Sequence, residues 1–291
     1  MSEQNIKTIR RESIEAILDS IFENGMQSRR EIADDTSLSL MTVGRVVETF
    51  TDCGLLTYSR SNTDSPGRKA GVSIPDTDRY YLIADKTGGM GRLYIYDALG
   101  SETKRLDLDG SLESGEVSGE YINRLLVEMT GELNFFKCMG VGVILPNDAD
   151  TEAFMSLPAE FALSPFAVCA DTLSSCAVDH LRFLHLLPEF GTAFYLSHEP
   201  PFGMFIFDGR PIMCEGGPVG DISRLDGSVS DRLETAYRLL GFERLITDDA
   251  SNMPPNLCAD IRTIPENIRP SHRGMIRRLR FAAARKIVNN M

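Results

Sequence analysis

The sequence lacks any long hydrophobic segment. No stretch of roughly 18 consecutive apolar residues occurs in the 291-residue chain, so a membrane-spanning helix is not expected. The first residues, MSEQNIKTIRRES, also lack the apolar core of a signal peptide. We therefore expect a cytoplasmic protein.

Cysteine is scarce, and no two cysteines are closely spaced. The six cysteines include no CxxC motif, which predicts reduced, buried thiols in a cytosolic protein rather than disulfides or zinc ligands. They are Cys53, Cys138, Cys169, Cys176, Cys214 and Cys258. The four histidines show no ligand spacing either, so we expect neither a bound metal nor another cofactor.

Positive charge is in short supply over most of the chain. The net charge of −12 at pH 7 opposes binding of nucleic acid over the surface as a whole. Residues 1–75 are nearly balanced, with nine basic and eleven acidic side chains, so most of the excess negative charge lies after them. Any contact with nucleic acid should therefore come from the N-terminal quarter. Apolar residues make up 42% of the chain, which is ordinary for a globular protein.

The N-terminal quarter begins with the pattern of two helices. Apolar residues recur at helical spacing from Ile6 to Ile21 and stop before Asn24, which is followed by glycine, so a first helix should end there. Ser28 and Glu31 have the spacing of a capping box. This spacing predicts that a short second helix starts directly after Ser28.

A third helix should follow Ser39, whose side chain can cap it. Apolar residues at i, i+3, i+7 and i+10 predict one buried face, formed by Leu40, Val43, Val47 and Phe50. Met41, Thr42 and Arg45 lie on the other face. Two short helices joined by a tight turn form a helix-turn-helix, whose second helix can enter the DNA major groove. We therefore expect Ser39, Met41, Thr42 and Arg45 to form the DNA-reading surface.

A β-hairpin is predicted after the third helix. Strand-like residues 55–60 and 71–74 flank a polar tip, and three helices followed by a hairpin make a winged helix. Arg60, Arg68 and Lys69 on this wing can meet phosphates or the minor groove. A helical protein–protein module is the alternative interpretation.

The remaining residues predict an α/β domain. Strands and helices alternate after Pro75, and two hairpins of similar form, turning at residues 87–90 and 198–202, indicate a duplicated lobe. The predicted strands are residues 80–84, 91–96, 105–109, 140–145, 193–197 and 204–207. The predicted helices are residues 121–136, 172–187 and 282–288.

Residues 27–75 resemble the N-terminal domain of ROK-family transcriptional repressors, in which a winged helix precedes a sugar-kinase-like domain. The stretch SRREIADDTSLSLMTVGRVVETF and the wing segment Pro66-Gly67-Arg68-Lys69 carry the resemblance. It implies a winged-helix DNA-binding domain at residues 1–75 and a degenerate ROK sugar-kinase-like domain at residues 76–291. The implied fold of the second domain is the two-lobed, actin-like ATPase fold with a sugar cleft between its lobes.

The resemblance also locates two phosphate loops, both altered. Asp85 to Asp97 matches the spacing of the family's first phosphate motif, and Asp208-Gly209 matches the end of the second. Asp85 can either hold a magnesium-bound water or cap a tight turn. The second loop carries Glu199-Pro200-Pro201, in which prolines remove N–H donors and the carboxylate repels phosphate. We therefore predict no phosphoryl transfer.

The resemblance implies a partly retained sugar site, which we assign to an effector. Asn147 lies in the family's substrate loop, where it can bond a hydroxyl or block the cleft. Asp171 matches the family's catalytic base, so it is either a relic of that base or a helix N-cap. Asp221 corresponds to a family glutamate, and Arg224 replaces a zinc-binding histidine. Arg224 can pair with Asp221 or reach an anionic group of a ligand.

Three functions are compatible with these features. The first is a non-enzymatic repressor that binds operator DNA as a homodimer or a dimer of dimers and senses a sugar or sugar derivative. The alternative is an active sugar kinase with an accessory N-terminal domain, and the third is a scaffold that binds neither ligand. ROK-family proteins typically carry a cluster of cysteines that binds zinc, and this sequence lacks it. This difference and the loop with Pro200 and Pro201 favour the first function.

Overall fold

The computed structural model describes residues 3–52, 54–60, 70–73, 79–87, 91–107, 137–147, 167–198, 201–215, 217–251, 253–264 and 269–289. The wing tip at 61–69 and the helix expected at 121–136 lie outside these ranges. Within them, no helix is both long and apolar enough to cross a membrane.

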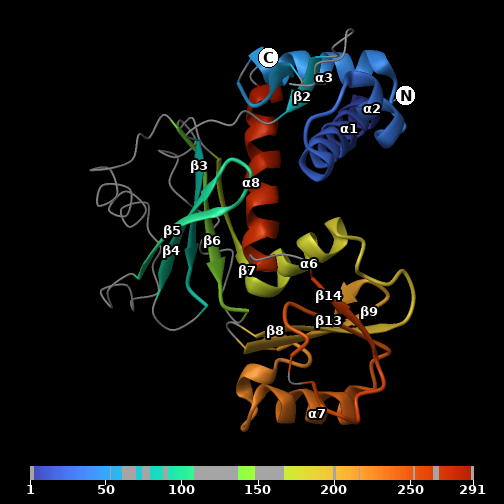
Figure 1. Ribbon diagram of the computed structural model, residues 1–291, viewed down its shortest axis with the longest axis vertical. Helices are drawn as coiled ribbons and strands as arrows, with labels where there is room; N and C mark the ends of the chain where they lie inside the picture. Colours follow the sequence, from blue (N-terminus) through green and yellow to red (C-terminus); the bar gives the residue numbers. More distant parts are fainter. Residues whose placement is uncertain are drawn as a thin grey trace.

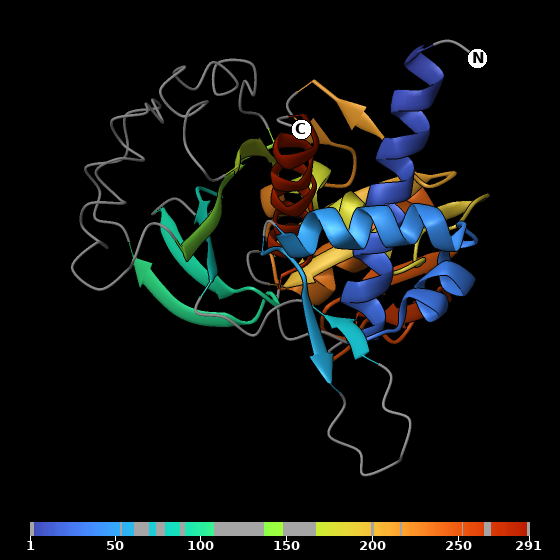
Figure 2. The ribbon, with the colours of Figure 1, turned by 90° about the horizontal axis from the view of Figure 1, so that it is seen from above.

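A winged helix occupies one end of the molecule (Figure 1). Its helices are α1 (Glu3–Asn24), α2 (Arg29–Thr36) and α3 (Leu40–Asp52). Its wing strands, β1 (Thr57–Arg60) and β2 (Ala70–Ser73), pair antiparallel, and Figure 2 shows this hairpin extending away from the helices. The predicted winged helix is therefore confirmed.

Local sequence signals account for the ends of these helices. Gly25 follows α1 with a φ of +70°, a conformation that glycine adopts without strain. The Ser28 hydroxyl accepts a hydrogen bond from the Glu31 backbone N–H, and the Glu31 side chain accepts one from the Ser28 N–H. The predicted capping box is thus present, and it fixes the start of α2.

The buried face of α3 differs from the predicted one at its first residue. Val43, Val47 and Phe50 are fully buried as expected, and Gly44 joins them. Leu40, however, is 57% exposed, so its assignment to the core was wrong. It occupies the first position of the helix.

Two sheets with the same topology confirm the duplicated lobe. In each, an antiparallel meander of three strands is followed by two strands that join in parallel, so the orders are β5-β4-β3-β6-β7 and β10-β9-β8-β13-β14. The first sheet consists of β3 (Tyr80–Asp85), β4 (Arg92–Asp97), β5 (Glu102–Asp107), β6 (Cys138–Leu145) and β7 (Ala167–Thr172). The second consists of β8 (Thr192–His198), β9 (Pro201–Phe207), β10 (Arg210–Pro211), β13 (Arg244–Thr247) and β14 (Asp260–Thr263).

Helices and a small hairpin complete the two lobes. They are α6 (Leu173–Phe183), the 3-10 helix η4 (Ile222–Arg224), α7 (Val229–Leu240), β11 (Met213–Cys214) and β12 (Gly217–Pro218). Helix α6 ends four residues before the predicted boundary at residue 187, because the chain turns through His185, whose φ is +54°. One apolar core contains residues of both sheets, and a second lies between the second sheet and α7.

The last helix, α8 (Pro270–Asn289), is 20 residues long, so the predicted helix at residues 282–288 covered only its end. It packs against α6, β6 and β7 (Figure 1). Its Gly274 lies so close to α6 that a Cβ there would be 1.9 Å from the carbonyl oxygen of Cys176. Only glycine permits this helix–helix approach.

Helix α8 also reaches the winged helix (Figure 1). Phe281 and Ala284 are buried in the same apolar core as α1, α2 and α3. Arg277 makes a two-bonded ion pair with Asp19 of α1, with N–O distances of 3.0 and 2.6 Å. The core of the winged helix is therefore completed by residues from the other end of the chain.

Candidate nucleic-acid interface and kinase-like site

The start of α3 is organised by hydroxyl groups. The Ser39 hydroxyl accepts a hydrogen bond from the Thr42 backbone N–H at 3.1 Å, which confirms Ser39 as the cap of α3. The Ser39 and Thr42 hydroxyls also lie 2.9 Å apart. Ser39 and Thr42, two of the predicted DNA contacts, therefore lie at the start of α3. This is the part of a recognition helix whose side chains meet bases.

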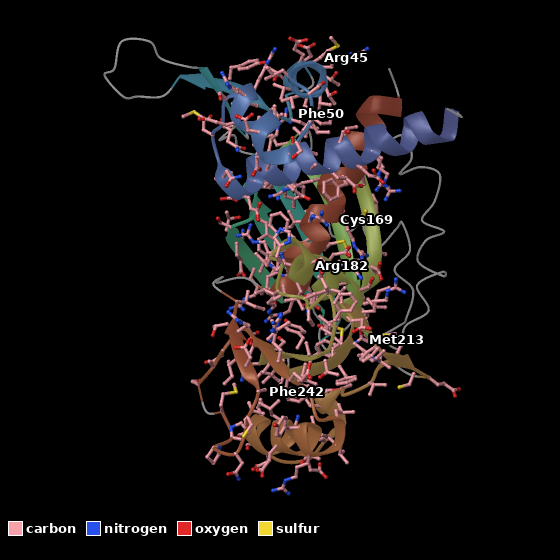
Figure 3. All side chains as sticks on the ribbon, turned by 90° about the vertical axis from the view of Figure 1, so that its right-hand side faces the viewer. Arg45, Phe50, Cys169, Arg182, Met213 and Phe242 are labelled. Atoms are coloured by element: carbon pink, nitrogen blue, oxygen red, sulfur yellow. The ribbon has the colours of Figure 1, made fainter. Side chains whose placement is uncertain are left out.

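The outward face of α3 carries Met41, Arg45 and Glu48 at i, i+4 and i+7. Met41 is 76% exposed, and Arg45 and Glu48 are also exposed. In Figure 3, Arg45 lies at the extreme end of the molecule, while Phe50 lies on the inner side of the same helix.

A cluster centred on Arg29 lies beside this face, and the sequence analysis missed it. Arg29 donates from Nη2 to Glu48 Oε1 at 3.0 Å and from Nε to the Tyr58 hydroxyl at 3.0 Å. The hydrogen bond to Tyr58 raises the pKa of Arg29 above its usual value. These residues come from α2, α3 and β1, and their separations of 19 and 29 positions leave no local sequence signal.

The wing residues are only partly described. Arg60 ends β1 and pairs with Ala70 across the hairpin. Arg68 and Lys69 lie outside the described residues.

Asp85, at the end of β3, is held entirely by protein groups. Its carboxylate is 4% exposed. Oδ1 accepts from the Thr87 backbone N–H at 2.9 Å and from its hydroxyl at 2.6 Å. Oδ2 accepts from Arg269 at 3.2 Å and lies 3.0 Å from His272 Nε2. The turn-capping geometry, one of the two alternatives for Asp85, is thus present.

His272 continues this network into the core. Its Nδ1 lies 2.6 Å from the Tyr96 hydroxyl. Burial lowers the pKa of His272 and raises that of Tyr96, so the neutral imidazole accepts from Tyr96 O–H and donates from Nε2 to Asp85. Burial also opposes ionisation of Asp85, but the hydrogen bonds from His272 and Thr87 outweigh it and lower the Asp85 pKa to about 2.

Asp171, at the end of β7, is likewise bonded within the protein. It forms an ion pair with Arg278 of α8, and it accepts from the Thr172 N–H at 2.6 Å and from the Ser175 hydroxyl at 3.3 Å. The N-cap of α6 is Thr172, whose side chain accepts from the Ser175 N–H, so the N-cap interpretation of Asp171 was wrong. The strand continues through Thr172, which places the cap one residue later.

The four proposed effector residues come from both lobes, and the side chain of Arg224 lies outside the described residues. Asn147 lies near Asp171, because its side-chain oxygen accepts from the Ser174 N–H at 2.9 Å in the first turn of α6. Asp221 instead caps η4 by accepting from the Ser223 N–H at 3.0 Å. Arg224 is the last residue of η4.

The site that corresponds to the second phosphate loop is acidic. His198 Nδ1 lies 2.8 Å from Asp248 Oδ1, and the Ser197 hydroxyl donates to the same carboxylate at 3.2 Å. Asp248 follows β13, which runs parallel to β8, so their carboxyl ends meet here. Pro201 opens β9 opposite His198 and was wrongly assigned to the loop, whereas Glu199 and Pro200 lie outside the described residues. Carboxylates at this position repel phosphate.

The residues also do not fit the zinc site of the resembled family. Cys214 is exposed on β11, where its thiol lies 3.2 Å from the Gly217 carbonyl oxygen, and Cys258 is exposed elsewhere. Within the described ranges, no group of three or more Cys, His, Asp or Glu is placed to hold a metal ion.

Comparisons with known proteins show similarity in fold. No family model and no curated protein matches the sequence. A solved ROK family transcriptional regulator, described as a homolog of the E. coli MLC protein, superposes with a TM-score of 0.61 at 11% identity, over 97% of this chain and 99% of that chain.

Two further structures match more weakly. A ROK family protein from Streptococcus pneumoniae in complex with sucrose has a TM-score of 0.41 at 10% identity and covers 69% of this chain and 97% of its own. A ROK hexokinase from Thermus thermophilus has a TM-score of 0.37 at 11% identity and covers 72% and 99%. The predicted fold, a winged helix before a two-lobed actin-like ATPase fold, is thus confirmed, and the chain resembles a ROK-family transcriptional regulator over nearly its whole length.

Proposed function

We propose that this protein is a sequence-specific DNA-binding transcriptional regulator that acts as a repressor. Residues 1–75 are the DNA-binding domain, and residues 76–291 are a kinase-like domain without phosphoryl transfer. The observation that carries the proposal is the outward face of α3, where Met41 and Arg45 are exposed at the end of the molecule. A helix that presents an exposed arginine beside a wing is suited to the major groove.

Each predicted DNA contact has a distinct role in this proposal. Arg45, Met41 and Thr42 meet base edges, and Ser39 supports the first turn. The basic wing residues, Arg60, Arg68 and Lys69, meet the backbone or the minor groove. A homodimer, or a dimer of dimers, then reads a roughly palindromic operator with half-sites about 34 Å apart.

Internal pairing supports the loss of kinase activity. The carboxylate in the first phosphate motif, Asp85, is bonded to Arg269 and His272. The carboxylate at the position of the catalytic base, Asp171, is paired with Arg278. A magnesium ion or a substrate hydroxyl would have to displace these side chains, two of which, His272 and Arg278, belong to α8, which packs against the first sheet.

An effector site is the remaining part of the proposal. Asn147, Asp171, Asp221 and Arg224 are proposed to bind a neutral sugar or sugar derivative, with Arg278 yielding Asp171 to the ligand. Titration calorimetry with mono- and disaccharides tests this part. Binding that is lost in Asp171→Asn supports it, whereas equal binding by both proteins removes Asp171 from the site.

Selection from a pool of random duplex DNA tests the proposed function itself. We expect the full-length protein to enrich one sequence with approximate twofold symmetry. Affinity for this sequence should fall steeply with salt, because phosphate contacts release counterions. A pool that shows no enriched sequence after repeated rounds would contradict DNA recognition and favour the scaffold.

A further inference from the structure

Arg29 connects three elements of the winged helix. It lies at the start of α2, donates to Glu48 of α3, and donates to the hydroxyl of Tyr58 in the wing strand β1. Its guanidinium also lies over the Tyr58 ring, 5.5 Å from the centroid. A single side chain therefore ties the recognition helix to the wing.

The guanidinium is held close to the backbone of α3. A Cβ placed on Gly44 would lie 3.5 Å from Arg29 Nη1, so the arginine packs over the glycine of this helix. Arginine suits such a position because its planar fork presents several fixed donors at once. The carboxylate of Glu48 and the ring of Tyr58 therefore both restrict the position of the Arg29 guanidinium.

Glu48 needs such a partner if α3 enters a groove of DNA. It lies on the outward stripe with Met41 and Arg45, and its side chain is 62% exposed. A bare carboxylate on this stripe would face the phosphate backbone, and like charges at an interface weaken binding. Arg29, at 3.0 Å, neutralises it.

We propose that Arg29 is a positioning residue for DNA recognition, which fixes α3 against the wing through Tyr58 and masks the Glu48 carboxylate from the DNA backbone. This inference rests on the proposed DNA-binding function. It assigns roles to three residues, Arg29, Glu48 and Tyr58, that the sequence pattern of the helix-turn-helix does not single out.

Two other roles are chemically reasonable and predict different data. Arg29 can instead contact a phosphate directly, in which case Glu48 is irrelevant to its effect. Glu48 can instead accept a hydrogen bond from a cytosine amino group, in which case it sets the preferred base at one position. A double-variant cycle separates these roles from masking.

The experiment measures affinity and its salt dependence for full-length protein on the selected DNA sequence. The variants are Arg29→Met, Glu48→Gln, Tyr58→Phe and the Arg29→Met/Glu48→Gln double variant. Arg238→Met and Glu234→Gln form the matched control, because this exposed pair on α7 also joins an arginine to a glutamate. Helix α7 lies at the end of the molecule opposite α3 (Figure 1).

We expect Arg29→Met to bind about tenfold more weakly and Glu48→Gln, in the same background, to restore affinity to within about threefold of wild type. Glu48→Gln alone should change neither affinity nor base preference by more than about threefold, and Tyr58→Phe should weaken binding less than Arg29→Met. The control pair should leave binding unchanged.

Three results would overturn the inference while leaving DNA binding intact. One is an Arg29→Met variant with wild-type affinity. Another is a double variant as weak as Arg29→Met, with a salt slope reduced by about 0.9, which marks a lost phosphate contact. The third is a changed base preference in Glu48→Gln. If Arg29→Met does not fold, Tyr58→Phe decides in its place: weaker binding supports the inference, and wild-type affinity overturns it. A wild-type protein that selects no DNA overturns the proposed function, and the inference with it.

Discussion

At Asp85, both carboxylate oxygens are bonded to groups of the protein itself. Thr87 donates to one oxygen, and Arg269 and His272 lie against the other. The same arrangement recurs at Asp171, where Arg278 is the cationic partner. At the scale of single residues, the carboxylates at the positions of the first phosphate motif and the catalytic base are bonded to His272 and Arg278 of α8.

The buried His272 makes stability depend on pH. Its folded pKa lies below the usual 6.5 because of burial, so the unfolded chain takes up a proton that the folded chain refuses. Its contribution to stability is therefore complete above pH 6.5 and declines as the pH falls toward the folded pKa. We expect the free energy of unfolding, measured in urea, to lose up to about 1.4 kcal/mol per pH unit from this residue.

A His272→Gln variant isolates this contribution. The stability difference between wild type and His272→Gln should shrink as the pH falls from about 7 to 5. His185→Gln serves as the control, because His185 is exposed on a turn. A difference that stays constant over this range would show that folding leaves the pKa of His272 unchanged, and one that grows as the pH falls would show that His272 is protonated in the folded protein.

At the scale of elements, α8 joins the two parts of the chain. Its first half lies on the first sheet, where Met275 and Leu279 enter the core shared by both lobes. Its second half supplies Phe281 and Ala284 to the core of the winged helix. Two adjacent arginines of α8 pair with acidic groups in the two parts of the chain: Arg277 with Asp19 of α1, and Arg278 with Asp171 and Asp179.

Truncating Phe281 should loosen the winged helix selectively. Loss of a buried phenyl ring costs about 3–5 kcal/mol, and Phe281 contacts the core formed by α1, α2 and α3. We expect Phe281→Ala to speed amide hydrogen exchange in these helices while strands β3 and β6 stay protected. Phe242→Ala, which removes a ring from the separate core beside α7, should leave the exchange of α1–α3 unchanged. Equal effects of both variants would argue against a shared core.

Local signals explain which parts of the fold could be predicted from sequence. Ser28 and Glu31 are three positions apart, and this spacing alone predicts the start of a helix. The two hairpins were predictable because their strands and turns have similar spacing in the sequence. The first half of α8 reads as a basic segment with few apolar residues, so it was missed. The role of Arg278 in this half depends on its ion pair with Asp171, which is 107 positions away in the sequence.

In the candidate site, too, contacts between residues close in sequence could be predicted, and contacts between distant elements could not. Ser39 and Thr42 are neighbours in sequence, and their contact was predictable. Asp171 was assigned to ligand binding or capping because its partner, Arg278, lies on a distant element. The Arg29 cluster was likewise hidden, because three elements must pack before its members meet.

At the scale of the whole molecule, the winged helix and most of the excess negative charge belong to different parts of the chain. The winged helix lies at one end, with Arg45 at the extremity, and Phe242 lies near the other (Figure 3). Most of the excess negative charge belongs to residues after 75, whereas the proposed DNA contacts belong to residues before 75. In the proposed function, the acidic protein approaches DNA through its nearly neutral N-terminal quarter.

The kinase-like lobes should neither bind ATP tightly nor use it. We expect millimolar ATP with magnesium to leave the melting temperature unchanged, because a ligand bound only by the folded state must raise it. We also expect no ADP release above background with a panel of hexoses. Sugar-dependent ADP release that disappears in Asp171→Ala would restore the kinase alternative.

The central claim is that the outward face of α3 reads DNA, and one measurement tests it most directly. Affinity is measured for wild type and Arg45→Ala on the selected sequence and on every single-base variant of it, with Arg238→Ala on α7 as the control. If Arg45 bonds a base, Arg45→Ala should lose about 1–3 kcal/mol on the selected sequence and stop discriminating at one base position, while other positions keep their preferences. An Arg45→Ala protein that binds and discriminates at every position as wild type does would contradict the claim.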